Sequence, residues 1–235
     1  MGIAERKERE KDMQKRMRRR QILEAAKRVF HNRGFSAATV EDIAQEAELS
    51  PAALYLYFKN KDDIYVSLNL QLLEYLSDRL EELHRGKGPA PEEKLRSLKD
   101  LLYDVFNFDP LILINLFHLQ ASEGLKKLPP QRSEQLNHLA ARCLRILAGI
   151  FEQGVTEGAF VHAHPIAVAD IFWSVFTGAV LWEESKKMTQ PRKDYLKQTL
   201  DLAFDVLVRG LKKEQAERPV QGMYGPHKSL TPSPA

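Results

Sequence analysis

The chain has 235 residues, of which 43% are hydrophobic and 29% charged, and its formal net charge is only +3. That length allows one large or two modest domains with a buried core, and the single cysteine, Cys143, excludes an intramolecular disulfide. The first segment is too charged for a signal peptide, and no apolar run approaches the ~18 residues of a membrane span, so we expect a cytoplasmic protein without membrane insertion.

Positive charge is concentrated at the amino-terminal end. Residues 1–61 carry 14 Lys and Arg against 9 Asp and Glu, whereas residues 62–235 carry 21 against 23. Residues 1–17 have almost no apolar side chain, which predicts a disordered basic arm or a frayed helical extension. The run Arg18, Arg19 and Arg20 follows, and it can enter a DNA minor groove or act as a solubilising segment that strengthens non-specific phosphate binding.

Residues 18–62 show the pattern of a DNA-binding unit. The first helix has one apolar face and ends at Gly34; a second and a third short helix begin at Thr39 and Ser50, both of them N-cap residues. Only a few residues separate the second and third helices, so the two must cross steeply, as in a helix-turn-helix. The apolar positions of the three helices are Ile22, Ala25, Ala26, Val29, Phe30, Val40, Ile43, Ala44, Ala47, Leu49, Leu54 and Phe58.

With these flanks, the sequence resembles the TetR family of bacterial transcription regulators. The resemblance covers roughly the first third of the chain, and the remainder is similar in being helical and of suitable length. It implies an all-α fold with a three-helix DNA-binding head and a larger ligand-binding and dimerisation domain. The matching positions are Ala26, Phe30, Gly34, Phe35, Thr39, Val40, Ile43, Ala44, Ala47, Leu49, Ser50, Leu54, Tyr55, Tyr57, Phe58, Lys59 and Lys61.

The resemblance also implies which residues contact DNA. Thr39, Tyr55, Tyr57 and Lys61 correspond to phosphate-contacting positions, and Ser50 stands at the N-terminus of the recognition helix, where N–H groups favour an anion. For the two tyrosines, burial in the core is the competing interpretation. The positions that would read bases are Pro51, Ala52, Ala53 and Leu56.

Two features depart from many relatives. None of the four base-reading side chains can form a hydrogen bond, so we expect readout through thymine methyl groups and groove shape, and an operator rich in A and T. Glu48 stands where relatives often have glycine, so either the turn is bent differently or Glu48 adopts a strained positive φ.

The rest of the chain is predicted to be helical. A connector helix runs from residue 61 to 85, and further helices are expected at 92–109, 111–120, 131–156, 166–187 and 192–213. We therefore expect a domain at 63–213 followed by a disordered tail at 214–235. The last two helices are the candidate homodimer interface, with packing within the chain as the alternative.

Aromatic residues of the large domain could enclose a pocket for an apolar or aromatic effector, although most of them could equally fill a core. The expected ligand-binding residues are Phe117, His118, Trp173 and Phe176, with Asn115 and Cys143 as further polar groups. Ligand binding would release a repressor from DNA; the alternative is a large domain that binds a protein partner and no small ligand. No catalytic motif, cofactor site or metal site is expected, because His162 and His164 have no third ligand near them in sequence.

Overall fold

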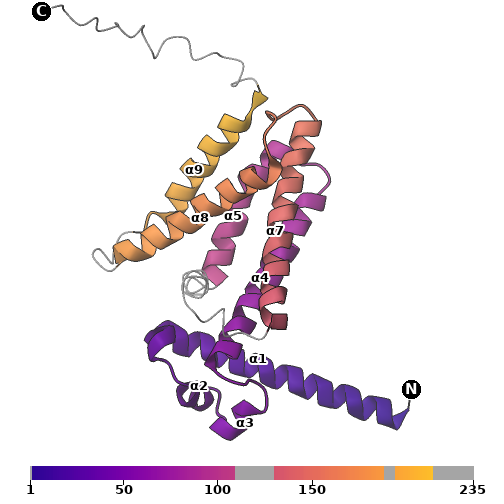
Figure 1. Cartoon of the computed structure of the whole chain (residues 1–235), viewed down its shortest axis with the longest axis vertical. Helices are drawn as coiled ribbons and strands as arrows, with labels where there is room; N and C mark the ends of the chain where they lie inside the picture. The colour runs from indigo at the N-terminus through magenta and orange to yellow at the C-terminus, as the bar shows by residue number, and fades with distance from the viewer. Residues whose placement is uncertain (1, 109–129, 188–193, 214–235) are drawn as a thin grey trace, which may run out of the picture.

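In the computed structural model, the described residues are 2–108, 130–187 and 194–213, and their regular secondary structure is helical (Figure 1). The helices are α1 (Ile3–Ala37), α2 (Val40–Glu46), α3 (Pro51–Tyr55), α4 (Lys61–Arg85), α5 (Pro91–Phe108), α7 (Pro130–Thr156), α8 (Pro165–Lys187) and α9 (Leu196–Leu211). The predicted fold class is confirmed. The helix expected at 111–120 lies outside the described residues, and so does the tail at 214–235.

The head is formed by α1, α2 and α3 around one apolar core. Every apolar position predicted for this core is buried except Leu49, which is half-buried. α1 bends at Gly34, where φ is 73°, and this turn directs Phe35 onto Tyr65 of α4 with ring centroids 4.6 Å apart. The head is therefore packed directly onto the first turns of α4.

The amino-terminal arm differs from the disordered state expected for it. Residues 3–17 continue α1 as one helix, although the described side chains there are exposed to solvent. The helix is compatible with this exposure because acidic and basic residues alternate at spacings that allow pairing along the helix. Of the two states that composition allowed, the structure shows the helical extension.

The large domain places α4 and α7 side by side, with α5 packed against both and α8 against α7, while α9 packs against α5 and α8 (Figure 1). Helix α4 connects the two parts of the molecule without a break, from the head to Arg85. Its predicted bounds match the structure, and those of α5, α7 and α8 agree within one or two residues. α9 begins at Leu196 rather than at residue 192.

Candidate DNA interface and ligand cavity

Side-chain caps begin both helices of the helix-turn-helix. Thr39 Oγ1 accepts from Asp42 N at 3.1 Å while Asp42 Oδ2 accepts from Thr39 N at 3.0 Å, which is a reciprocal capping box. Ser50 Oγ accepts from Ala53 N at 3.2 Å, and Pro51 occupies the first turn of α3. Thr39 and Ser50 are both exposed, so the predicted helix N-termini are open to a phosphate.

The turn between α2 and α3 contains a backbone conformation that L-residues rarely adopt. Glu48 has φ of 54°, and among the described non-glycine residues it alone has a positive φ. Leu49 N then donates to Ala44 O at 2.8 Å, which closes the turn. Of the two alternatives, Glu48 therefore takes the strain, and the turn keeps the geometry that glycine would accept more easily.

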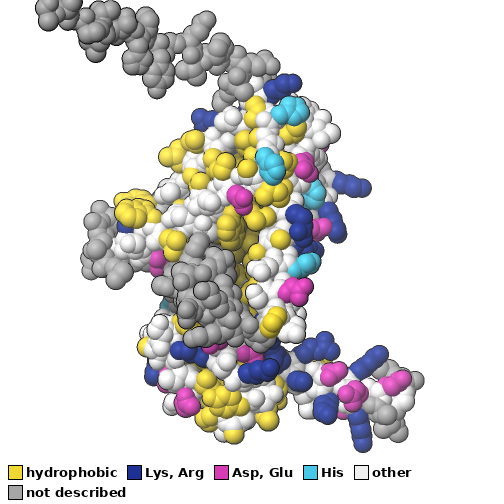
Figure 2. All heavy atoms as spheres, in the orientation of Figure 1, with side chains coloured by type: hydrophobic (Ala, Val, Ile, Leu, Met, Phe, Trp, Pro, Cys, Tyr) yellow, Lys and Arg dark blue, Asp and Glu magenta, His cyan; other side chains and the backbone are white. Residues whose placement is uncertain are grey.

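The outward face of α3 is apolar. Leu54 and Phe58 are buried, whereas Leu56 and Tyr55 expose 79% and 50% of their surface. Pro51 and Ala52 are exposed, and Ala53 and Tyr57 are half-buried. Figure 2 shows apolar side chains at this lower end of the head. All four base-reading candidates thus lie on or at the edge of one surface, and Tyr57 is partly drawn into the core.

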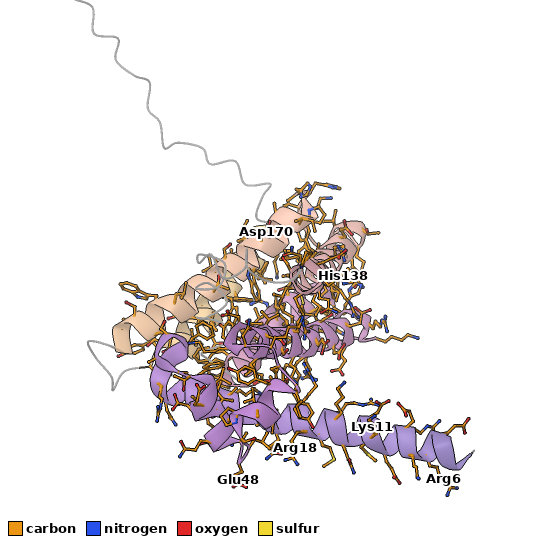
Figure 3. The ribbon with its side chains drawn as sticks, turned by 60° about the horizontal axis from the view of Figure 1, so that its bottom comes forward. Arg6, Lys11, Arg18, Glu48, His138 and Asp170 are labelled. Carbon is orange, nitrogen blue, oxygen red and sulfur yellow. The ribbon has the colours of Figure 1, made fainter. Side chains whose placement is uncertain are left out.

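The three consecutive arginines point in three directions, because successive helical residues are about 100° apart. Arg18 donates to Gln21 Oε1 at 2.8 Å and lies on the same lower side of the head as Glu48 (Figure 3). Arg20 instead lines a cleft between α1, α4 and α7. Of this run, Arg18 keeps an orientation suited to the DNA side of the head, and Arg20 does not.

Arg19 is part of the head's structure. Its Nη1 donates to Tyr57 O at 2.6 Å, and its guanidinium lies 4.2 Å from the centroid of the Phe58 ring. Burial and the nearby Arg132 lower its pKa, against the opposing effect of Asp63. Arg19 thus holds the end of the recognition segment onto α1, and its contact with DNA stays a prediction.

Lys61 has hydrogen-bond partners within the head, and its expected phosphate contact stays a prediction. Its ammonium donates to Phe35 O at 2.7 Å, Ser36 O at 3.3 Å and Ala38 O at 2.8 Å. An ammonium has three N–H donors, so all three are used within the head. Lys61 therefore satisfies the carbonyls that end α1, and it holds the start of α4 to the head.

A small apolar cavity of about 60 Å³ lies between α4, α5 and α7 in the large domain. Trp173 of α8 lines it, whereas Phe176 is fully buried behind, with its ring centroid 5.8 Å from that of Trp173; that these residues bind a ligand stays a prediction. Phe117, His118 and Asn115 lie outside the described residues. The cavity lining is Leu73, Leu76, Leu80, Leu98, Leu102, Ala140, Cys143, Leu144, Leu147 and Trp173.

Cys143 supplies a polar atom at this cavity, and Ser77 lies beside the cysteine. Cys143 Sγ lies 3.8 Å from Leu73 O. In a helix a serine can bond to the carbonyl four residues before it, and for Ser77 that carbonyl is also Leu73 O. The Ser77 hydroxyl is fully buried and lies near the Cys143 thiol, whose pKa it lowers against the larger effect of burial. Burial raises the pKa of the Cys143 thiol to about 11, so the group is a neutral thiol near pH 7.

An ion pair joins α7 to the first turn of α4, beside the junction with the head. Arg132 Nη2, in the first turn of α7, lies 3.2 Å from Asp63 Oδ1 in the first turn of α4. Asp63 Oδ2 also accepts from Lys59 N at 3.1 Å, in the segment that follows α3. Sequence reasoning missed this pair because 69 positions separate the two residues and neither stands in a recognisable motif.

α8 and α9 share an exposed apolar surface. By length and composition α8 is long and apolar enough to cross a membrane, so the prediction that the chain has no apolar run of that length is wrong. Asp170 interrupts this apolar run in the sequence. Only 33% of that stretch is buried in the protomer. The large apolar side chains left exposed on or beside these helices are Ile171, Leu181, Trp182, Tyr195, Leu202 and Val206.

The described residues contain no group of three potential metal ligands. His164 Nδ1 accepts from Ala167 N at 3.4 Å, so this histidine caps the N-terminus of α8. His162 is exposed on the same short segment.

Comparison with known proteins agrees with this geometry. A family model described as bacterial regulatory proteins of the tetR family matches residues 22–68. The fatty acid metabolism regulator protein of Bacillus subtilis is 28% identical over 172 residues, which are 72% of this chain and 85% of that protein.

Solved structures give the same fold over most of the chain. The regulator PfmR from Thermus thermophilus is similar with a TM-score of 0.66 and 25% identity, covering 82% of this chain and 99% of that one. FadR from Bacillus subtilis, solved in complex with stearoyl-CoA, is similar with a TM-score of 0.63 and 22% identity over 81% and 98% of the two chains. These relatives are DNA-binding regulators and not enzymes. The amino-terminal unit of the chain is that of the TetR family of bacterial transcriptional regulators, and most of the chain has the fold of that family's solved members.

Proposed function

We propose that this regulator is a cytoplasmic repressor that binds a pseudopalindromic operator as a homodimer and leaves it when an apolar ligand enters the large domain. The observation that carries the proposal is the exposed outer face of α3, together with the capped N-termini of α2 and α3. One such helix covers about half a turn of major groove, so a specific site needs two heads roughly 34 Å apart. The proposed domains are residues 18–62 for DNA and 63–213 for ligand and dimer.

The dimer is assigned to α8 and α9. Their exposed apolar side chains form a surface of a kind that monomeric proteins rarely leave exposed to solvent. The small residues Ala167, Ser174 and Gly178 are also exposed on α8, where a partner helix can approach closely. A twofold axis through this face would place the same surface of each subunit against its copy. The apolar character of α8 is thus assigned to a subunit interface and not to a membrane.

The operator is proposed to be rich in A and T at the contacted steps. Pro51, Ala52, Ala53 and Leu56 present methyl and methylene groups, which suit thymine methyls and a matching groove shape. Thr39, Ser50, Tyr55 and Tyr57 are the proposed phosphate contacts, because each combines a polar group with a place at a helix N-terminus or on the α3 side of the head.

The ligand is proposed to be apolar, and a long-chain acyl thioester is the first one to test. The cavity walls are leucines with one tryptophan, and the related FadR was solved with stearoyl-CoA. A cavity of about 60 Å³ is much smaller than an acyl chain, so such a ligand must displace its walls. A ligand that fits a second conformation better than this one shifts the protein toward that second conformation.

This displacement can reach the head along α4. The cavity is lined by Leu73, Leu76 and Leu80, and the same helix holds the head through Lys61 and Asp63. A ~100-fold loss of operator affinity requires about 2.7 kcal/mol of differential ligand binding, which burial of an acyl chain can supply.

A different large-domain role would leave the head's function intact. In that alternative the domain is a protein-interaction platform, and no small molecule changes DNA binding. Trp182, with 66% of its surface exposed, would then belong to a surface for another protein.

Selection of bound fragments from genomic DNA tests the proposal. At about 150 mM salt non-specific phosphate binding is weakened, so sequence preference dominates the enrichment. A pseudopalindrome with A/T-rich contacted steps, released by stearoyl-CoA, is the expected result. A palindrome that no acyl thioester releases would favour the platform, and absence of any enriched sequence would overturn operator reading.

A further inference from the structure

The helical arm of α1 carries a stripe of basic residues on one side. Lys7, Lys11 and Lys15 fall within about 60° of Arg18 around the helix axis, at about 100° per residue. By the same measure Glu8 lies about 20° beyond Lys15 and Glu10 about 60° beyond Lys7, so acidic residues border the stripe but none lies within it. The stripe is therefore positive although the arm as a whole carries both signs.

The stripe continues the face of α1 that packs into the head. By the same rotation, the buried residues Ala25 and Val29 lie within about 20° of Arg18. α2 and α3 lie on this side of α1, below it in Figure 1, while the cleft residues Arg16 and Arg20 lie toward the large domain. The arm extends beyond α3, so its stripe has no protein beneath it and faces the side from which DNA approaches.

The side chains of the stripe are available for an external partner. Lys7, Lys11 and Lys15 are exposed, and none forms a hydrogen bond or ion pair with a described residue. From Lys7 to Arg18 the helix advances about 17 Å, a length comparable with about five base pairs. In Figure 1 the arm points away from the side that carries α9, so in the proposed dimer it would lie at the outer end of each half-site.

We infer that the helical arm is a second DNA-binding element, whose basic stripe contacts backbone phosphates of the duplex outside the half-site read by α3. The proposed partner of the stripe is double-stranded DNA, because the stripe is positively charged and continues the side of the head that is proposed to face DNA. The inference rests on the proposed function and adds to it that the bound length exceeds the operator core. Contacts of this kind strengthen binding and set position without reading sequence.

The test compares two charge-matched variants of the full chain. In K7Q/K11Q/K15Q the stripe is removed, and in R6Q/R9Q/R16Q the same charge is removed from other faces of the arm. Glutamine is a good helix former, so both variants should keep their helicity by circular dichroism. Each is titrated with the selected operator as a minimal duplex and with the same duplex extended by about 10 bp, one helical turn, at each end.

The extended duplex should bind the wild-type chain more tightly than the minimal one, and only the stripe variant should lose this gain. Loss of three phosphate contacts should lower the slope of log K against log salt by about 2 to 3 per subunit on the extended duplex. Equal losses in the two variants, or no gain from the flanks, would overturn the inference. Retained binding of the minimal duplex would still support operator reading, so the two proposals fail separately; without a selected site, the same salt slopes are measured on a random duplex.

Discussion

Arg132 of α7 and Asp63 of α4 form an ion pair beside the junction with the head, with Nη2 and Oδ1 3.2 Å apart. Because Asp63 also accepts from Lys59 N, this pair connects α7 to the segment that follows the recognition helix. The pair therefore stands next to the segment that joins α3 to α4.

Arg132→Gln should weaken the coupling between ligand and DNA. The substitution removes the charge that ties α7 to α4, and a partly exposed pair of this kind contributes about 1 kcal/mol or less to stability. The operator dissociation constant is measured with and without stearoyl-CoA. The ratio of the dissociation constant with ligand to that without ligand should fall severalfold relative to wild type. The control Arg145→Gln, at an exposed position of the same helix, should have the wild-type ratio. Equal ratios in both variants would contradict this role.

Glu48→Gly should stabilise the protein by about 1 kcal/mol, because glycine accepts positive φ without the steric penalty of a side chain. Gln45→Gly, at an exposed helical position of α2, is the control and should destabilise by a similar amount. Urea unfolding measures both. A lower midpoint for Glu48→Gly would show that the strain was misassigned.

Lys61→Met separates a structural role from a DNA contact. Loss of the ammonium leaves the carbonyls of Phe35 and Ala38 without their donor, so stability should fall by about 1–3 kcal/mol. The salt dependence of operator binding by the folded variant should stay unchanged. A slope smaller by about 1 with normal stability would instead restore the phosphate contact.

Leu202→Glu should separate the dimer, because 68% of the leucine surface is exposed on the protomer and would be buried against a partner carrying the same charge. Sedimentation equilibrium should report a monomer, with operator binding lost at concentrations that saturate wild type. The control Asn137→Asp adds one negative charge at an exposed position of α7 and should remain dimeric. A dimeric Leu202→Glu would exclude this face.

The Cys143 thiol should react slowly with a disulfide reagent at pH 8. Burial raises its folded pKa to about 11, whereas an unfolded thiol titrates at about 8.5. The unfolded chain therefore loses its proton first, so stability is unaffected below about pH 8 and falls as pH rises toward 11. Labelling followed by absorbance should slow further when stearoyl-CoA fills the cavity. Fast labelling at pH 8 that the ligand does not change would contradict this placement.

The head could be predicted from the sequence because its signals are local. Thr39 and Ser50 cap within three residues, and Leu54 and Phe58 are one turn apart, so short-range pattern specified both the helices and their core. Arg18, Arg19 and Arg20 are adjacent in the sequence, which predicted one shared DNA contact. The rotation of the helix directs their side chains apart.

Long-range partners could not be predicted in the same way. The contacts of Arg132 with Asp63 and of Cys143 with Leu73 join residues about 70 positions apart, and only tertiary packing brings them together. The apolar pattern of α8 predicted a helix, but the sequence could not show which side of that helix remains exposed.

The stoichiometry of binding to a full and a half operator tests the central claim most directly. With the selected site as probe, titration at protein concentrations above the dissociation constant should give two chains per full site, and a duplex carrying a single half-site should bind far more weakly. One chain per site, with equal affinity for half and full operators, would contradict a regulator that reads DNA through two heads held together by α8 and α9.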